Sequence, residues 1–433
     1  MLWCLLMSLL ISSALCRLAP RSTPVKLPCR LSATNLPASI TDTLSHEQQQ
    51  YEYLDSGNGR RLERFGGHLV ARNCPSATWV PGLPASAWAQ ASLRHDGTSW
   101  VGLETLGLAT AASGAPAPKS ASARGAQGER KTSGSSAVSD ASAASSVGAG
   151  SWRARVGGGV VLELAPSEQG QVGVFMEQQQ QWGWIRQTIA RDAAGSGADA
   201  GGGGGGGAGA DGRGVRVLNG FAYTGGSTLA ALGAGNGLEL GLGLGLGLGA
   251  EAGAEVGSED KRASAARVEG SSYSISVTHL DASSAAVKWA QRNVLASGLA
   301  DKPCRFIVDD CSTFLRREVA RGKRYDGLIF DPPAFGRGGG GKVWKLEKDL
   351  PVLVGLMAQL LSDRPLFMLL SCHDPAWGAA ELEALLRGGA GGVEGFGRRL
   401  DGARVDGGEM RLVSGRGGRS LGLGSFVRAS WAR

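Results

Sequence analysis

Apolar residues in the second half of the chain form short continuous runs, and helical patterns lie between these runs. Runs of this length predict strands that are covered on both faces. Strands that alternate with helices predict a parallel sheet. We therefore expect an α/β fold with a doubly wound, mostly parallel, Rossmann-like sheet. The predicted strands are 215–221, 277–280, 305–308, 326–330 and 366–370, and the predicted helices are 227–232, 283–297 and 350–361.

Two of the predicted helices have recognisable ends. Ser283 is a suitable N-cap, and Val287, Ala290 and Val294 share one face of the helix that follows it. Gly298 supplies the stop signal. In the helix over 350–361, Pro351 is acceptable because we expect it in the first turn.

Composition divides the 433 residues into structured and low-complexity parts. The chain has 70 glycines, many of them in runs too poor in large apolar residues to offset the entropy of ordering. We expect a linker at 109–150 and inserts at 192–214 and 233–272. We also expect a smaller β-rich N-terminal region at 51–185 and a doubly wound domain at 186–433.

The first 41 residues predict a targeting segment. Leu2–Leu15 is apolar but too short to span a bilayer. The leader is acid-free up to Thr41 and contains serine and arginine, which favours an organelle transit peptide over a secretory signal. We expect an organellar location, with the chloroplast favoured over the mitochondrion.

Charge and cysteine content indicate little by themselves. The formal net charge is +7, and four of the basic residues lie in the leader; without them the chain has 41 basic against 38 acidic residues, or +3. An arginine excess over 387–433 could hold phosphates or could be a solvated surface. Seven cysteines without a C-x-x-C pair, and five histidines that do not cluster near them, predict neither a disulfide scaffold nor a metal site.

Polar residues follow several predicted strands at the edge where an open parallel sheet binds ligands. They are Gly225-Gly226, Asp281, Asp310, Asp331 and Cys372. A glycine-rich first turn suits a nucleotide-like ligand, but Tyr223–Ser227 lacks the G-x-G-x-x-G spacing of an NAD site. Asp281 fits hydrogen bonding to a ribose diol. Its distance along the chain from Gly226 is explained if most of 233–272 is an insert.

A second glycine-rich segment matches a phosphate-binding loop only in part. Gly336–Lys342 has the spacing G-x-x-x-x-G-K, but Val343 stands where such a loop needs Ser or Thr for Mg²⁺. We expect a flexible loop near the site rather than a P-loop.

Several separated motifs resemble those of a known family. They are VLNGFAYTGGSTLAAL, VTHLDASSAAVKWAQRN, FIVDDCSTFLRREVARGKRYDGLIFDPPAFGRG, VWKLEKDLPVL and PLFMLLSC, and the likeness extends to 51–65 and 172–185. These segments resemble class I S-adenosylmethionine-dependent methyltransferases related to the bacterial large-subunit ribosomal RNA cytosine-C5 methyltransferases.

The resemblance implies S-adenosylmethionine as cofactor and RNA, in particular rRNA, as substrate. It implies that Asp281 holds the ribose, Asp310 the adenine, and Asp331 the methyl-donor end of the pocket. The implied cofactor-binding residues are Asn219, Phe221, Ala222, Tyr223, Thr224, Gly225, Gly226, Asp281, Ala282, Asp310, Cys311 and Asp331.

Two methylation chemistries fit these residues. In amino-directed methylation Asp331 and a proline carbonyl accept hydrogen bonds from an amine, although Phe335 stands one place later than the aromatic residue of that motif. In pyrimidine C5 methylation a cysteine thiolate first adds to the ring, and Cys372 matches the cysteine position of the cytosine-C5 relatives. The expected catalytic residues are therefore Asp331 and Cys372.

Other interpretations stay open at this point. The chain could be a catalytically inactive cofactor-binding factor for ribosome assembly, or it could methylate a protein or small molecule. Tryptophans in the N-terminal region could stack on bases or fill the core. If 172–185 packs onto the catalytic domain, we expect Phe175 and Trp184 to cap the pocket.

Overall fold

A computed structural model of the chain describes residues 51–107, 150–157, 159–198, 214–235, 273–337, 343–388, 396–415 and 419–433. The leader, the linker apart from Gly150, and most of both inserts lie outside the described residues. The predictions made for those segments therefore stay predictions.

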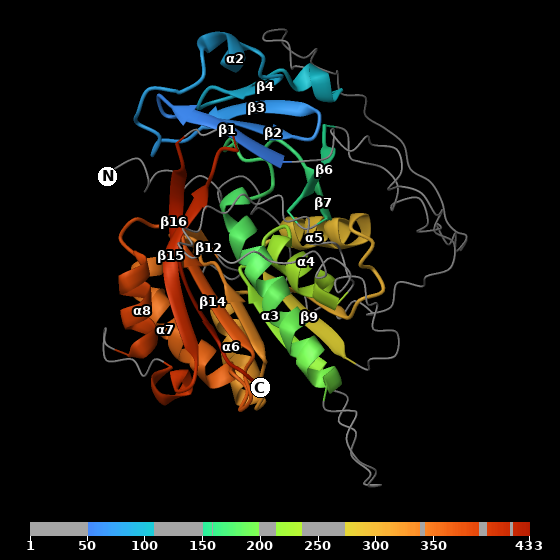
Figure 1. Cartoon of the computed structure of the whole chain (residues 1–433), viewed down its shortest axis with the longest axis vertical. Coiled ribbons are helices and arrows are strands. Elements are labelled where there is room, and N and C mark those ends of the chain that lie inside the picture. Colours follow the sequence, from blue (N-terminus) through green and yellow to red (C-terminus); the bar gives the residue numbers. More distant parts are fainter. Residues whose placement is uncertain are drawn as a thin grey trace, which may run out of the picture.

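The centre of the molecule is a seven-stranded sheet in the order β10-β9-β8-β11-β14-β16-β15 (Figure 1). The first five of these strands run parallel, and β16 runs antiparallel to both of its neighbours. The sheet confirms the predicted fold class. Its strands are β8 (Gly214–Gly220), β9 (Ser274–Asp281), β10 (Cys304–Val308), β11 (Gly327–Phe330), β14 (Phe367–Cys372), β15 (Arg404–Leu412) and β16 (Leu421–Ser430).

Helices cover both faces of this sheet because successive strand residues point to opposite sides. Val217 packs in one core cluster with side chains of α3, α4 and α5, whereas its neighbour Leu218 packs in the other with α6, α7 and α8. The helices are α3 (Gln179–Ala198), α4 (Gly226–Leu232), α5 (Ser284–Ala296), α6 (Cys311–Ala320), α7 (Leu346–Leu360) and α8 (Ala379–Arg387), with 3-10 turns η7 (Gly233–Gly235) and η10 (Gly397–Leu400).

The ends of α5 agree with those predicted from the sequence, whereas the start of α7 differs from its predicted position. The Ser283 hydroxyl accepts the Ala286 amide as the N-cap of α5, and Gly298 adopts φ +69° after its end, as predicted. Helix α7 begins at Leu346, four residues earlier than predicted, so Pro351 lies in the second turn. The Asp349 carboxylate accepts the Lys345 amide at 2.8 Å and satisfies a donor at the helix start, which explains the earlier beginning.

Two elements bear on the predicted segments. Helix α3 runs from Gln179 to Ala198, so it crosses the expected division between 185 and 186 and occupies the first residues of the expected insert 192–214. The G-x-x-x-x-G-K segment joins the antiparallel strands β12 (Phe335–Arg337) and β13 (Val343–Lys345), rather than leading into a helix as a P-loop does. Residues 338–342 of that segment lie outside the described residues.

The N-terminal region is β-rich, as predicted, and packs against the catalytic domain. Its sheet lies beside the β15–β16 hairpin, where the Tyr53 hydroxyl donates to the Arg419 carbonyl at 3.3 Å (Figure 1). A separate hairpin contacts α5, and the Arg292 guanidinium pairs there with Glu163 at 3.0 Å. The elements are β1 (Tyr51–Gly57), β2 (Arg60–Phe65), β3 (His68–Asn73), α2 (Ala85–Ala89), β4 (Leu93–His95), β5 (Trp100–Val101), η3 (Leu103–Leu106), and the hairpin β6 (Trp152–Val156) with β7 (Val160–Leu164).

The tryptophans of this region have structural roles. The indole N–H groups of Trp79, Trp88 and Trp100 donate to Ser56, Asp55 and Ser167, respectively. Trp152 and Trp182 are buried in the core. Because these side chains are hydrogen-bonded or buried within the fold, the structure favours a packing role for the tryptophans over stacking on bases.

Candidate active site

The first β-α turn is a tightly folded loop at the carboxyl edge of the sheet. Phe221 and Tyr223 adopt left-handed backbone conformations (φ +56° and +48°), which are uncommon for residues with a side chain and occur mainly at functional sites. A Cβ on Gly220 would lie 2.4 Å from the Phe330 ring, so only glycine fits there. Glycine at the end of β8 thus lets the loop Phe221–Gly226 turn closely over the neighbouring strand at the carboxyl edge.

Asp281 fixes this turn from the neighbouring strand. Its carboxylate accepts the Tyr223 amide at 2.8 Å and the Ser283 amide at 2.8 Å. Burial raises the pKa of Asp281, and the two amide hydrogen bonds partly offset that rise. Each carboxylate oxygen has a second lone pair, so Asp281 still has acceptors for the two hydroxyls of a ribose beside Ala282.

The predicted adenine contacts lie one strand further along the same edge. Asp310 is the N-cap of α6, where its carboxylate accepts the Thr313 amide at 2.9 Å. Cys311 is buried beneath Gly220, and burial raises the pKa of its thiol well above the ordinary range. The Asp309 amide donates to the Asp281 carbonyl at 3.1 Å, which brings these residues close to the ribose position.

Asn219 braces the turn from below. Its side-chain amide is buried and donates to the Thr228 hydroxyl at 2.9 Å, and that hydroxyl contacts His279 Nδ1 at 2.9 Å. Burial lowers the pKa of His279 to about 3, so this imidazole is neutral. The Asn219 side chain therefore supports α4 rather than facing the carboxyl edge.

Asp331, directly after β11, is the most densely hydrogen-bonded of the predicted residues. Its carboxylate accepts the Ser371 hydroxyl at 2.8 Å and the Gln178 amide at 2.9 Å, and His373 Nε2 lies 3.4 Å away. Burial would raise the pKa of Asp331, but His373 and the hydrogen bonds outweigh it and the pKa is lowered. Asp331 is therefore a carboxylate that is held in one orientation.

A segment of the N-terminal region covers this end of the site. The Thr224 hydroxyl donates to the Gly173 carbonyl at 2.7 Å, and the Phe175 ring lies 5.6 Å from Tyr223 and 5.5 Å from His373. The next turn, η5 (Met176–Gln178), brings Gln178 to Asp331. Phe175 therefore caps the site as predicted.

Trp184 does not cap the site with it. This ring packs edge-on against Phe367 at 5.7 Å and lies under the Arg428 guanidinium. Helix α3 directs it into the core because the helix begins at Gln179 and runs along the sheet.

Cys372 lies on the wrong face of its strand for the predicted nucleophilic role. Ser371 points toward Asp331, so the next side chain in β14 points to the opposite face, where Cys372 is fully buried among the residues of the second core cluster. Burial raises the pKa of this thiol to about 12, although the Asp374 amide donates to it. A cysteine nucleophile needs a thiolate, so the geometry does not support Cys372 as one.

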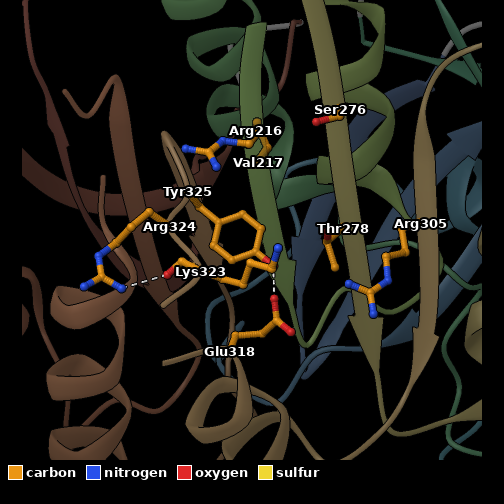
Figure 2. A pocket seen from close by; sticks show the side chains of 9 residues that line it. All are labelled: Arg216, Val217, Ser276, Thr278, Arg305, Glu318, Lys323, Arg324 and Tyr325. Atoms are coloured by element: carbon orange, nitrogen blue, oxygen red, sulfur yellow. Dashed lines mark hydrogen bonds between the residues drawn. The ribbon is translucent and has the colours of Figure 1, made fainter. Parts of the chain in front are cut away.

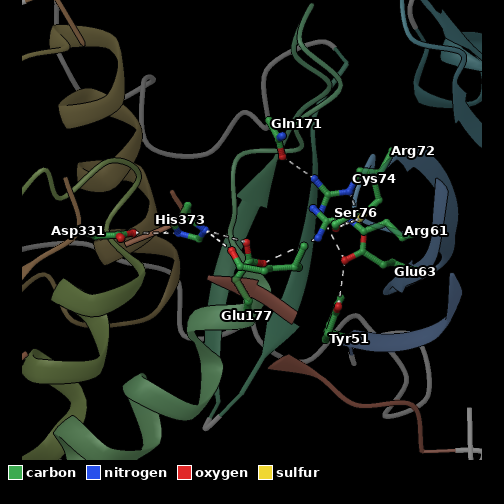
Figure 3. Close-up of polar contacts among 11 residues, drawn as sticks. Tyr51, Arg61, Glu63, Arg72, Cys74, Ser76, Gln171, Glu177, Asp331 and His373 are labelled. Atoms are coloured by element: carbon green, nitrogen blue, oxygen red, sulfur yellow. Dashed lines mark hydrogen bonds and ion pairs between the residues drawn. The ribbon is translucent and has the colours of Figure 1, made fainter. Parts of the chain in front are cut away.

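Sequence reasoning missed three residues around Asp331: Gln178 and Ser371 donate hydrogen bonds to it, and Glu177 reaches it only through His373. All three lie in segments that carry the family resemblance, but the resemblance assigned no role to them. Ser371 could have been found from strand alternation beside Cys372, but Gln178 and Glu177 could not, since they reach the site through the packing of the N-terminal region. Figure 3 shows Glu177 between His373 and the strands of that region.

A cavity of about 180 Å³ lies at the opposite, amino edge of the sheet (Figure 2). Arg216, Arg305 and Lys323 line it, with the buried pair of Tyr325 and Glu318 at its base. It is remote from the turn at Phe221–Gly226 and from Asp331 because it lies at the beginnings of the strands. In the described parts of the chain, no group of three His, Cys, Asp or Glu side chains is arranged to hold a metal ion, and no helix is long and apolar enough to cross a membrane.

Comparison with known proteins gave matches among solved structures. No family model and no curated protein matched the chain. The chain is similar to the SAM-dependent methyltransferase from Agrobacterium tumefaciens, with 25% identity over 89% of this chain and 92% of that one and a TM-score of 0.58. A Streptococcus mutans protein assigned to the SAM-dependent methyltransferases has 12% identity, coverage of 89% and 76%, and a TM-score of 0.48.

The fold and the edge site together define the class of protein. The carboxyl edge of the doubly wound sheet carries four of the predicted polar positions, namely Gly225-Gly226, Asp281, Asp310 and Asp331, and the Agrobacterium methyltransferase aligns with 89% of this chain. The chain is a class I methyltransferase. Its cofactor is S-adenosylmethionine, and the acceptors left on the Asp281 carboxylate fit the ribose of such a group.

Proposed function

We propose that this enzyme methylates RNA at a nitrogen that carries an N–H group on a nucleobase. The observation that carries the proposal is the carboxylate of Asp331, held by Ser371, Gln178 and His373 at the edge where the first turn lies. S-adenosylmethionine supplies an electrophilic methyl group when it is bound. The residues of the chain would then have to orient the acceptor and take up its proton.

Asp331 has the properties that amino-directed methylation needs. An ionised carboxylate accepts a hydrogen bond from an amine, which turns the nitrogen lone pair toward the methyl donor, and it can take the proton that the nitrogen sheds. The hydrogen bonds from Ser371 and Gln178 and the ion-pair contact with His373 use only part of the lone pairs of Asp331. One acceptor position is therefore left for the substrate.

Aromatic rings beside Asp331 favour a planar acceptor. Phe175, Tyr223 and His373 contact one another in a row, and each is partly exposed. Flat rings next to a hydrogen-bond acceptor suit an unstacked base, the usual target of base-reading RNA enzymes. The Pro333 carbonyl already accepts the Trp344 indole N–H at 2.7 Å, whereas Asp331 keeps an acceptor for the substrate.

RNA as the substrate rests mainly on the family resemblance of the motifs. The arginine-rich tail supports RNA binding less than its composition suggested, because several of its guanidinium groups form ion pairs with carboxylates of the same chain. These pairs are Arg387 with Glu383, Arg411 with Glu409, Arg428 with Asp406 and Arg433 with Asp192. The acid-free leader supports an organellar rRNA as the substrate, with the chloroplast before the mitochondrion.

Cytosine C5 methylation is the second candidate. It is supported by the place of Cys372 at the end of β14, directly before His373. It would require the strand end to move so that the thiol leaves the core and loses its proton. A protein or small-molecule acceptor would need no such change, but would make less use of the aromatic row.

Methylation of defined RNA tests the proposal. The full chain is incubated with isotopically labelled S-adenosylmethionine and an unmodified transcript of organellar large-subunit rRNA, and the labelled nucleosides are identified by mass spectrometry. We expect label on a base nitrogen and its loss in Asp331→Ala. Label on C5 of cytosine would refute the amino-directed chemistry, and label on protein but not on RNA would refute the substrate class.

A further inference from the structure

Six charged side chains form an alternating chain from the site into the N-terminal sheet (Figure 3). They alternate in sign, so each of the four inner charges lies between two of the opposite sign. In order, they are Asp331, His373, Glu177, Arg61, Glu63 and Arg72.

His373 carries protons on both ring nitrogens in this arrangement. Its Nδ1 lies 2.8 Å from the Leu423 carbonyl, which can only accept, so Nδ1 is a donor. Its Nε2 faces the Asp331 carboxylate at 3.4 Å, and a bare nitrogen lone pair there would repel the carboxylate. Both positions therefore favour the imidazolium form.

Glu177 supplies the second negative charge against this imidazolium. Its Oε1 lies 3.7 Å from His373 Nδ1, and its side chain is buried. The titratable groups that face the ring are thus Asp331, after β11, and Glu177, in η5; β16 presents the Leu423 carbonyl and Phe175 packs on the ring. The adjoining Asp374 is turned to the Ala376 amide.

We infer that Glu177 and His373 are a positioning pair for methyl transfer, which keeps the Asp331 carboxylate oriented toward the acceptor. Arg61 anchors the pair from β2: its guanidinium lies 3.9 Å from Glu177 and 3.3 Å from Glu63. The N-terminal sheet is consequently part of the catalytic apparatus, since it supplies the cation that holds Glu177 in place. The inference rests on the proposed role of Asp331.

The histidine titration measures the pair without any acceptor. Imidazole signals of the full chain are followed by NMR against pH, and the His373 signal is assigned by its loss in His373→Gln. Burial lowers the pKa of His373, but Asp331 and Glu177 raise it to about 9. We expect Glu177→Gln to lower the titration midpoint by about 1 unit or more, because it removes a charge within 4 Å of the ring.

Arg64→Gln is the matched control for the network. Arg64 lies on the same strand as Arg61, but its pair with Glu52 is partly exposed, with 40% and 32% of the two side chains accessible, and lies outside the buried network. We expect this variant to leave the His373 midpoint unchanged. If Glu177→Gln does not fold, the wild-type titration still decides, because a midpoint near 6.5 would overturn the inference.

Methylation of the rRNA transcript links the pair to catalysis. We expect kcat of the wild type to fall as the pH rises through the His373 midpoint, and this fall to move to lower pH in Glu177→Gln, while the affinity for S-adenosylhomocysteine stays the same. An unchanged pH profile and an unchanged midpoint in Glu177→Gln would overturn the inference. If the transcript is not methylated at all but the midpoint shifts as expected, the positioning pair stands and the proposed substrate falls.

Discussion

Substitution of Cys372 by alanine separates the two methylation chemistries. With a pKa of about 12, only about one thiol in 10⁴ is ionised at pH 8, which leaves almost no thiolate for attack. We therefore expect Cys372→Ala to keep its methylation rate within about twofold of the wild type. Removal of one buried sulfur from the core should cost about 1 kcal/mol of stability, similar to the loss of one buried methylene group.

The neighbouring residue on the same strand provides the contrast. Ser371→Ala removes a hydrogen bond of 2.8 Å to the Asp331 carboxylate. A hydrogen bond to a charged group contributes about 1.5 to 3 kcal/mol, so if the transition state depends on it the rate should fall about tenfold to a hundredfold. Adjacent residues of β14 should thus differ in effect because they face opposite sides of the sheet.

The assay for both variants is single-turnover methylation of the rRNA transcript, with urea unfolding as the check on folding. A fall in rate of about a thousandfold or more in Cys372→Ala, at unchanged affinity for S-adenosylhomocysteine, would refute the reasoning and restore Cys372 as the nucleophile. A covalent adduct with RNA that contains 5-fluorocytidine, absent in that variant, would lead to the same conclusion.

Further predictions concern packing, a buried ion pair and pH. Gly220→Ala should destabilise the fold by about 1 to 3 kcal/mol in urea unfolding, because the added Cβ meets the Phe330 ring. Gly183→Ala should instead stabilise the fold by about 0.5 to 1 kcal/mol, because Gly183 lies inside α3 and faces open space. Arg72→Met should cost about 3 to 5 kcal/mol, since it removes the nearer of the two cations that neutralise the buried Glu63 carboxylate, and Arg64→Met should cost less than about 1 kcal/mol; equal costs would contradict the burial argument. Asp331 and Glu177 raise the pKa of His373 above its ordinary 6.5 to about 9 against the effect of burial, so its contribution to stability is complete below pH 6.5 and is lost as the pH rises through about 9. His373→Gln should lack this loss in urea unfolding measured from pH 6 to 10.

Much of the fold could be predicted because the apolar pattern of each segment and the strand order of a parallel sheet indicate the same architecture. Continuous apolar runs marked β8, β9, β10, β11 and β14, and the polar residues after them had to meet at one edge. Asp281 and Asp331 were found in this way. The predicted role of Cys372 is not supported because the direction of a side chain within a strand changes from one residue to the next. Ser371 faces Asp331, whereas Cys372, the next residue, faces the core.

The rest of the site depends on packing between distant segments. Gln178 reaches Asp331 across 153 positions of the chain, and Glu177 contacts both His373 and Arg61. Such contacts have no spacing signal, since they arise when the N-terminal region docks on the catalytic domain. The start of α7 was missed because it is set by the hydrogen bond of Asp349 to the Lys345 amide rather than by the apolar pattern, and α3 was not predicted as a helix.

Titration of the full chain with S-adenosylhomocysteine by calorimetry tests the central claim most directly. We predict saturable binding at one site per chain, a loss of about tenfold or more in Asp281→Ala, where the ribose loses its acceptor, and unchanged affinity in Arg216→Ala, which alters the cavity and the pair with Asp326 at the amino edge. Absence of saturable binding, or a loss caused by Arg216→Ala but not by Asp281→Ala, would contradict the assignment of the carboxyl edge as the cofactor site of a methyltransferase.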